Sequence, residues 1–199
     1  MLQEIEADAG EMWPRLDSGD LPLDDVTARR SIARFLAAMQ VRSMRLFKLQ
    51  KSTIELRDKL GLLRPDYEPV DGLDARDPGL MFSGTVQQHT PRLTETFAAK
   101  RWLMLRCDAD VLITSDLPLM FLRPGYKAGG PGTPNTVAAF PVGPRTLLFM
   151  DDRLEARSGY GALDSQLGIT VNRELWARSV RDVLTGRPPA EVRTQMSPQ

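Results

Sequence analysis

The segment "DVLITSDLPLMFL" at residues 110–122 holds two side chains that could take part in catalysis. Its first apolar run ends in Ser115 and Asp116, and Pro118 follows two residues later. A serine can act as a nucleophile when a base lies near it, and an aspartate can act as a base or bind a metal ion. Both residue types also bond to nearby backbone N–H groups and stabilise turns. The pair is therefore either catalytic or a corner between two buried strands, and turn chemistry favours the corner.

A second acidic pair, Asp151 and Asp152, ends the apolar run "TLLFM" at residues 146–150. If this strand end lies beside Asp116, the three carboxylates could hold Mg²⁺ or Mn²⁺, as a metal-dependent hydrolase or nuclease-like enzyme requires. A solvated turn at "MDDRLEA" is the alternative, which the preference of Asp for loops favours. The sequence indicates no other cofactor, so Asp116, Asp151 and Asp152 are the candidate metal ligands.

Histidine and cysteine chemistry is limited by composition, because the chain has one residue of each type, His89 and Cys107. A Ser-His-Asp triad would have to use His89, which no catalytic signature flanks. One histidine also excludes a histidine-rich zinc site within this chain. Cys107 is predicted to be a buried structural thiol. A single cysteine cannot form an internal disulfide, and we expect a reducing, cytoplasmic location.

The charge balance gives no general attraction to nucleic acid or to anionic membranes, because 26 basic residues offset 26 acidic ones. No run approaches the roughly 18 apolar residues that span a bilayer, and the acidic start "MLQEIEADAGEMW" lacks the pattern of a signal peptide. We therefore expect no membrane partner. The oligomeric state and the identity of any partner do not follow from the sequence.

One side of a predicted long helix is a local exception to this balance. Its basic residues could bind phosphate or nucleic acid, although that side lacks the interleaved aromatic residues that stack on bases. A solvated surface of an amphipathic helix is the favoured alternative. The basic residues are Arg30, Arg34, Arg45 and Lys48.

The elements that must position these residues change in character along the chain. Apolar periodicity and capping residues predict helices at residues 2–18, from 24 or 25 to 60, within 80–99 and at 172–185. Pro14 suggests a break in the first helix, and the second is long enough to bend or break at 41–45. Pro91 limits where the third helix can begin.

The second half contains short apolar runs separated by turn residues, as in a sheet of short strands. The runs lie at residues 101–107, 111–114, 119–122, 136–140 and 146–150. The density of Pro and Gly predicts surface loops at 64–79 and 123–135.

Helices first and strands later favour the α+β class, with long N-terminal helices packed on a mostly antiparallel sheet and with a C-terminal helix. We expect one domain at residues 1–186 and a flexible tail at 187–199. The helical part is expected at 1–63, the sheet part at 100–152 and the last helix at 172–185.

Three ordered segments carry a resemblance to a known family. Trp102 begins the first, "WLMLRC"; "ITSDLP" at residues 113–118 is the second, and "FPVGPRTLLF" at 140–149 is the third. They resemble the tryptophan-led strand, the "ITSDNP" segment and the "P-L-S-P-R" strand of the family catalogued as domain of unknown function 4238. Asn172, at the predicted start of the last helix, is a further matching position. Two departures are Leu117, where the family usually has Asn, and Gly143, where it often has Ser.

Members of that family also carry a His-Tyr-Val-Pro motif near the N-terminus, which this chain lacks, so the resemblance is to an N-terminally shortened member. The resemblance implies the fold and marks Arg145 and Asn172 as binding candidates, but it carries no established activity. The leading hypothesis is a non-enzymatic interaction module or an inactive shortened member. The alternatives are a metal-dependent hydrolase that uses Asp116, and nucleic-acid or phosphate binding by the basic helix.

Overall fold

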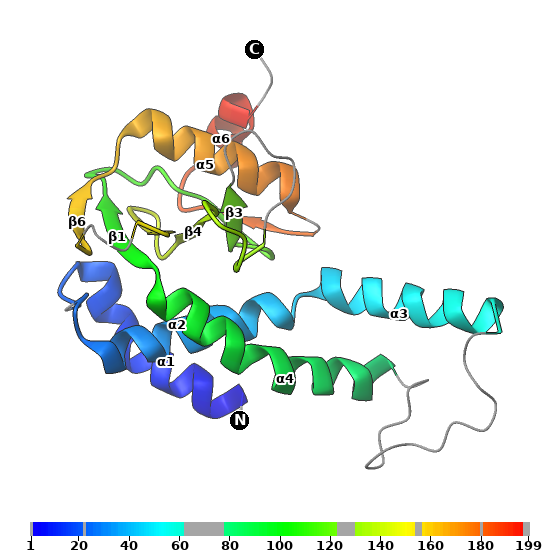
Figure 1. The fold of residues 1–199 in the computed structure, drawn as a ribbon. Helices are drawn as coiled ribbons and strands as arrows, with labels where there is room; N and C mark the ends of the chain where they lie inside the picture. Colours follow the sequence, from blue (N-terminus) through cyan, green and yellow to red (C-terminus); the bar gives the residue numbers. More distant parts are fainter. Residues whose placement is uncertain are drawn as a thin grey trace.

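A computed structural model describes residues 2–21, 23–61, 78–122, 130–153, 157–179 and 181–196. Within these ranges, a five-stranded sheet lies between two groups of helices (Figure 1). One face is covered by α1 (Leu2–Ser18), α2 (Val26–Val41) and α4 (Pro78–Ala99), and the other by α5 (Ser165–Arg178) and α6 (Pro189–Met196). The remaining helix, α3 (Met44–Lys59), extends away from the sheet.

The order of the strands explains how distant segments meet. The sheet runs in the order β3 (Met120–Leu122), β4 (Val137–Pro141), β5 (Thr146–Asp151), β1 (Arg101–Arg106) and β6 (Gly159–Ala162). β1 and β6 are parallel, and the other neighbouring pairs are antiparallel. A separate antiparallel pair joins β2 (Thr114–Ser115) to β7 (Val183–Leu184). The prediction of an α+β fold with a mostly antiparallel sheet is therefore confirmed.

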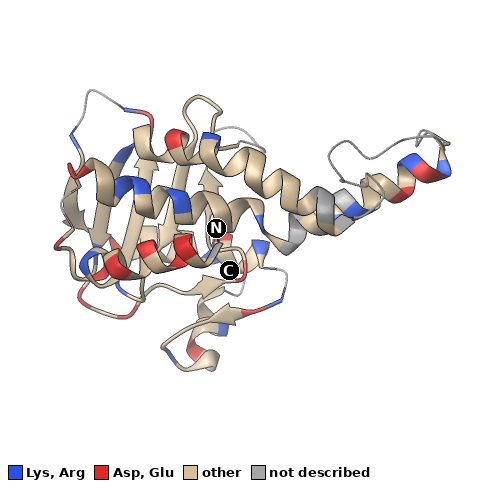
Figure 2. Cartoon of the chain, turned by 90° about the horizontal axis from the view of Figure 1, so that it is seen from below, with Lys and Arg blue, Asp and Glu red and all other residues tan. Residues whose placement is uncertain are grey.

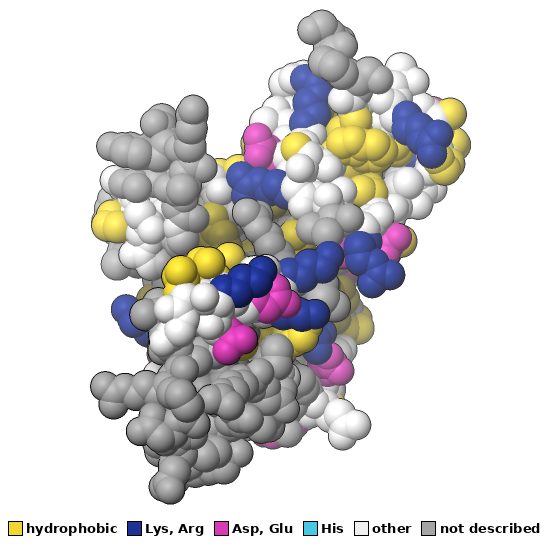
Figure 3. Space-filling view, turned by 90° about the vertical axis from the view of Figure 1, so that its right-hand side faces the viewer, with side chains coloured by type: hydrophobic (Ala, Val, Ile, Leu, Met, Phe, Trp, Pro, Cys, Tyr) yellow, Lys and Arg dark blue, Asp and Glu magenta, His cyan; other side chains and the backbone are white. Residues whose placement is uncertain are grey.

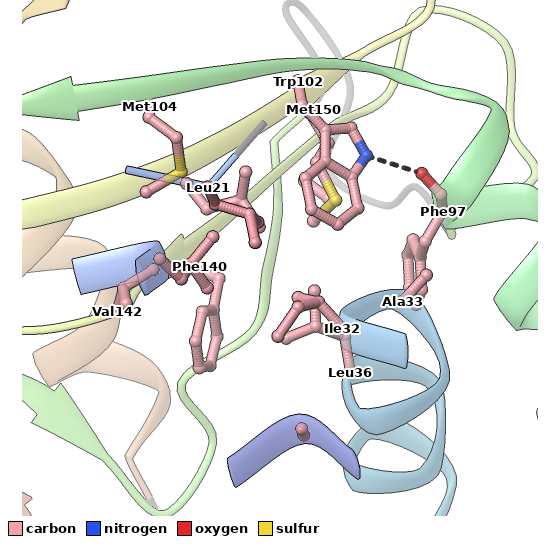
Figure 4. Close-up of a cluster of buried hydrophobic side chains, with 14 of the residues drawn as sticks. Leu21, Ile32, Ala33, Leu36, Phe97, Trp102, Met104, Phe140, Val142 and Met150 are labelled. Atoms are coloured by element: carbon pink, nitrogen blue, oxygen red, sulfur yellow. Dashed lines mark hydrogen bonds between the residues drawn. The ribbon is translucent and has the colours of Figure 1, made fainter. Parts of the chain in front are cut away.

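Burial on both faces of the sheet explains why its strands are continuous apolar runs. Along β5, Leu148 and Met150 join the core on the side of α1, α2 and α4, whereas Leu147 and Phe149 face α5 and α6. Successive side chains of a strand point to opposite faces, so a strand covered on both sides has few polar positions. Trp102 of β1 is fully buried in the first core, and its Nε1 donates to the carbonyl of Phe97 at 2.9 Å (Figure 4).

The helical layer is organised around α2, which packs against both α1 and α4. The Asp25 carboxylate caps α2 by accepting the N–H groups of Thr27 and Ala28 at 2.9 and 3.1 Å. The buried face of α2 includes Ala33 and Ala37, and such small side chains let neighbouring helices approach closely.

The predicted break in the long helix is present, but the two prolines do not interrupt the helices that contain them. The long helix is interrupted after Val41, within the predicted 41–45 region. Pro14 does not break α1, and Pro91 lies inside α4, which begins at Pro78 rather than within 80–99. A proline inside a helix removes one backbone hydrogen bond. Both helices pack along α2, and this packing supplies most of the stability of such helices.

The C-terminal predictions differ from the structure in four places. α5 begins seven residues before the predicted 172, because Asp164 caps it by accepting the N–H groups of Gln166 and Leu167. β7 occupies part of the predicted 172–185 helix, and β6 was not predicted. The predicted flexible tail contains α6, which is held by the buried side chain of Val192.

The predicted loops fall mainly outside the described residues, which omit 62–77 and 123–129. Helix α3 contacts α4 through an edge-to-face pair of Phe47 and Phe82, whose ring centroids are 5.4 Å apart. Leu49 and Leu56 of α3 are exposed. In the part of the chain that the structure describes, no helix has the length and apolar character needed to cross a bilayer.

Two helical glycines make matched probes of packing. A Cβ at Gly168 in α5 would lie 2.9 Å from Cγ1 of Val111, whereas a Cβ at Gly10 in α1 would meet nothing within 4 Å. We expect Gly10→Ala to raise the free energy of unfolding by about 0.5–1 kcal/mol, because alanine favours helix. Gly168→Ala should lower it by about 1 kcal/mol, because overpacking outweighs that gain. Urea unfolding measures both values, and equal stabilisation would contradict the close approach of α5 to Val111.

Candidate functional site

The two motif segments that carry the family resemblance lie side by side. The N–H groups of Val111 and Leu112 both donate to the carbonyl of Pro144, at 3.0 and 2.9 Å, and the N–H of Cys107 donates to the carbonyl of Arg145 at 3.0 Å. The segment that leads to Ser115 is therefore held at the turn between β4 and β5. Residues 111–113 do not form the predicted strand, although Leu112 and Ile113 are buried.

Asn172 holds this irregular segment from the other side. The side chain is fully buried in the middle of α5, where Oδ1 accepts the N–H of Ile113 at 3.0 Å and Nδ2 donates to the carbonyl of Val111 at 2.7 Å. One amide thus satisfies the same backbone groups that a neighbouring strand would satisfy. Arg187 adds a second donor to the Val111 carbonyl, at 2.8 Å. These bonds give Asn172 a structural role, whereas its binding role stays a prediction.

Ser115 and Asp116 form the corner that turn chemistry favours. Ser115 is buried in β2, and its Oγ accepts the N–H of Leu117 at 3.2 Å, as in a serine turn. The N–H of Asp116 donates to the carbonyl of Asp182 at 3.2 Å, which continues the β2–β7 pairing. His89 is exposed on α4, and among the described residues no hydrogen bond joins it to Ser115.

The three predicted metal ligands do not form a metal site. The described residues contain no group of three or more His, Cys, Asp or Glu side chains that could hold a metal ion. Asp151 lies opposite Arg101 at the start of β1, whereas the segment that leads to Asp116 is bound to Pro144, beyond the other end of β5. The length of β5 therefore separates the two groups that the metal hypothesis needed together.

Both strand-end aspartates instead bind basic side chains. Asp151 is buried and accepts hydrogen bonds from Arg101, at 3.0 and 2.5 Å, and from the Arg153 side chain, at 2.9 and 2.6 Å. Burial alone would raise the pKa of Asp151, but the hydrogen bonds from Arg153 and Arg101 outweigh it and hold the pKa below its ordinary value. Asp152 forms an ion pair with Lys100, whose side chain is 3% exposed.

The basic helix is largely neutralised by its neighbours. Acidic positions of α1 lie alongside basic positions of α2 (Figure 2). Arg34 pairs with Glu4 and Asp8, at 3.5 and 3.7 Å, and Arg30 pairs with Glu95 of α4. The hollow of about 520 Å³ between these helices is lined by charges that already pair with one another.

The remaining basic candidates lie elsewhere. Lys48 is exposed on α3, and the side chain of Arg45 lies outside the described part of the structure. Arg145 pairs with Asp110 at 2.5 Å, and the hydrogen bond from this carboxylate raises the pKa of the Arg145 guanidinium. The predicted binding residues are therefore not brought together in one site.

An apolar cleft of about 390 Å³ lies where the motif segments meet the helices. Trp13 of α1 and Phe35 of α2 form one wall, and their rings pack edge to face with centroids 5.4 Å apart. Residues 112–114 and 140–144 form the other wall, and 184–186 complete the lining. The sequence did not predict this cleft, because nothing around Trp13 or Phe35 shows which segment of the sheet each ring will face.

Comparison with known proteins identifies no relative: no family model matches the chain, and no curated protein or solved structure is significantly similar to it.

The bonds of Asn172 can be tested by removing its amide. Asn172→Ala leaves the N–H of Ile113 buried without a partner, and we expect the free energy of unfolding to fall by about 2–3 kcal/mol. Gln166→Ala, at an exposed position of the same helix, should change it by less than about 0.5 kcal/mol. If denaturant unfolding gives the same value for both variants, Asn172 does not hold the segment.

The Asp151 cluster predicts a specific loss of stability in acid. The pKa of Asp151 is lowered on folding, so its contribution is complete above the ordinary aspartate pKa, about 3.9, and is lost as the pH falls through the lower folded value. We expect Asp151→Asn to cost about 3 kcal/mol at neutral pH and progressively less below about pH 4. The control is Asp58→Asn, at an exposed position. Its free energy of unfolding should fall with decreasing pH as steeply as that of the wild type. A constant cost of Asp151→Asn at all pH values would contradict the lowered pKa.

Proposed function

We propose that the protein is a non-enzymatic interaction module that binds apolar side chains of a partner polypeptide in the cleft. The observation that carries the proposal is the convergence of both motif segments and two helical aromatic residues on one open, apolar surface. Clefts of this kind, lined by aromatic and aliphatic groups, are the common form of binding sites in proteins. The volume of about 390 Å³ suits one or two large side chains.

The rim of the cleft supports a polypeptide partner. Leu184 of β7 lines the cleft, and 64% of its surface is exposed. Hydrophobic side chains gather among Lys and Arg on the half of the molecule that contains α5 and α6 (Figure 3). An apolar centre with a polar rim is the usual anatomy of a protein interface.

The candidate catalytic residues give less support to the hydrolase alternative. The Ser115 hydroxyl bonds within its own turn, and Asp151 and Asp152 bind arginine and lysine side chains. The nucleic-acid alternative is weakened in the same way, because Arg30 and Arg34 pair with carboxylates. A binding role needs none of these groups to be available.

We also propose that the chain belongs to the family catalogued as domain of unknown function 4238. The support is that both segments that carry the resemblance contribute to the same cleft, through Ile113 and Thr114 of "ITSDLP" and through residues 140–144 of "FPVGPR". A cytoplasmic location is part of this proposal, and it is supported by the single cysteine, Cys107.

Selection of peptides from a random library on the immobilised protein tests the proposed function. We expect the selected peptides to carry paired aromatic or aliphatic residues and to bind at least about tenfold more weakly to Leu184→Glu, which places a charge at the rim. Leu49→Glu is the matched control, because Leu49 is 62% exposed on α3 and does not line the cleft.

Two outcomes would contradict the proposal. Selected peptides that bind Leu184→Glu and the wild type equally would place the interaction elsewhere. Binding of a small apolar dye in the cleft without any peptide binding would make the cleft a small-molecule site instead.

A further inference from the structure

A third hollow, separate from the apolar cleft and from the hollow between α1, α2 and α4, lies at the other end of β5. Its volume is about 290 Å³, and it is formed where the start of α2, the junction of α4 with β1, and the segment before β6 meet. We call it the arginine pocket, and its polar lining residues are Asp24, Arg29, Lys100, Arg101, Arg157 and Ser158.

Among the described residues, positive charge exceeds negative charge in the arginine pocket. Asp151 and Asp152 pair with Arg101 and Lys100, and Asp24 is the single acidic residue among the lining residues. Arg29 and Arg157 then remain against one carboxylate, which leaves an excess positive charge. Arg153 shares Asp151 with Arg101 and increases this excess. In a chain with zero net charge, this local excess distinguishes the pocket from the paired surface of α1 and α2.

Arg29 is half-buried without a carboxylate partner. Its Nη1 and Nη2 atoms donate to the carbonyls of Leu23, Ala98 and Lys100 and to the Ser158 hydroxyl. Within the described ranges no ion pair neutralises it, and burial lowers the pKa of Arg29 despite the attraction of Asp24. A buried cation is strongly disfavoured unless an anion or several dipoles compensate it. An anion in the pocket would therefore meet a charge that neutral dipoles and the attraction of Asp24 compensate, with no ion pair among the described residues.

Several hydrogen-bond donors of the pocket also remain available. Arg157 makes no hydrogen bond or ion pair with any described residue. The Lys100 ammonium has three N–H donors and bonds to two acceptors, the Thr136 carbonyl and Asp152. The Ser158 hydroxyl accepts from the N–H of Trp102, at 3.1 Å, and from Arg29, so its own proton can be donated.

We propose that the arginine pocket binds a small phosphate-bearing ligand, with Arg157 and the Ser158 hydroxyl as direct donors and with Arg29 as the fixed charge behind them. Guanidinium groups suit phosphate because they are always charged and offer donors in a fixed geometry. The volume lies at the lower limit for ligand sites, so the pocket suits a phosphate group with a small attachment. This function is independent of the apolar cleft and does not require it.

Calorimetric titration of the full chain with inorganic phosphate at low ionic strength tests the proposal. We expect one saturable site, and binding weaker by about tenfold or more in Arg157→Gln, because a charge-assisted hydrogen bond is lost. Arg92→Gln is the matched control, because Arg92 is an exposed arginine of α4 outside the pocket and the change in net charge is the same. Acetate at equal ionic strength should bind more weakly, because it carries one charge.

Arg157 is the better position to vary, because Arg29→Ala would also remove the bonds that hold the end of α4. The exposed Arg157 side chain can be changed without loss of the fold, which an unchanged melting temperature of Arg157→Gln would verify. The proposal is overturned if phosphate does not bind, or if Arg92→Gln weakens binding as much as Arg157→Gln. Peptide binding to the cleft should be the same in Arg157→Gln and the wild type, so the two proposals fail separately.

Discussion

The half-buried guanidinium of Arg29 bonds α2 to the junction between α4 and β1. The carbonyls of Ala98 and Lys100 lie at the end of α4, where a helix leaves its last acceptors without internal partners. Arg29 of α2 donates to both, so one helix caps the C-terminal end of another. Its guanidinium also lies 5.2 Å from the centroid of the Trp102 ring, within the range of a cation–π contact. This arrangement fixes the direction in which the chain leaves α4 and enters β1.

A fixed junction between α4 and β1 determines where the sheet is covered and where it is open. Trp102 is placed in the core beneath α2, and β1 then pairs with β5 along its length. At the far end of β5, α1 contacts the turn between β4 and β5, where the Thr146 hydroxyl donates to the carbonyl of Asp17 at 3.2 Å. A Cβ at Gly143 would lie 2.5 Å from Oδ1 of Asp17, which shows how closely α1 approaches this turn. The apolar cleft opens beside this contact, between Trp13 and the turn.

The sequence predicts those features of the structure that depend on local patterns, and it does not predict those that depend on contacts between distant residues. β1, β4 and β5 lie within one residue of their predicted bounds, because burial on both faces makes them continuous apolar runs. β6, with the sequence "GYGA", is mostly exposed and carries no such signal. The role of Asn172 depends on residues 111 and 113, about 60 positions earlier in the chain, and no local pattern can reveal that pairing. The metal hypothesis failed for the same reason. Asp116 and Asp151 lie toward opposite ends of β5, and this depends on how the strands pair, which no local pattern reveals.

The two proposed sites differ in chemistry because they lie at opposite ends of the same strand. Five residue steps along β5 from Thr146 to Asp151 span about 17 Å, at roughly 3.4 Å per residue. At the Thr146 end, backbone groups are satisfied by Pro144, Asn172 and Arg187, so the surface that remains is apolar. At the Asp151 end, more basic than acidic side chains converge, so the surface that remains is cationic. A small ligand cannot reach both ends of β5, so this geometry favours independent binding at the two sites.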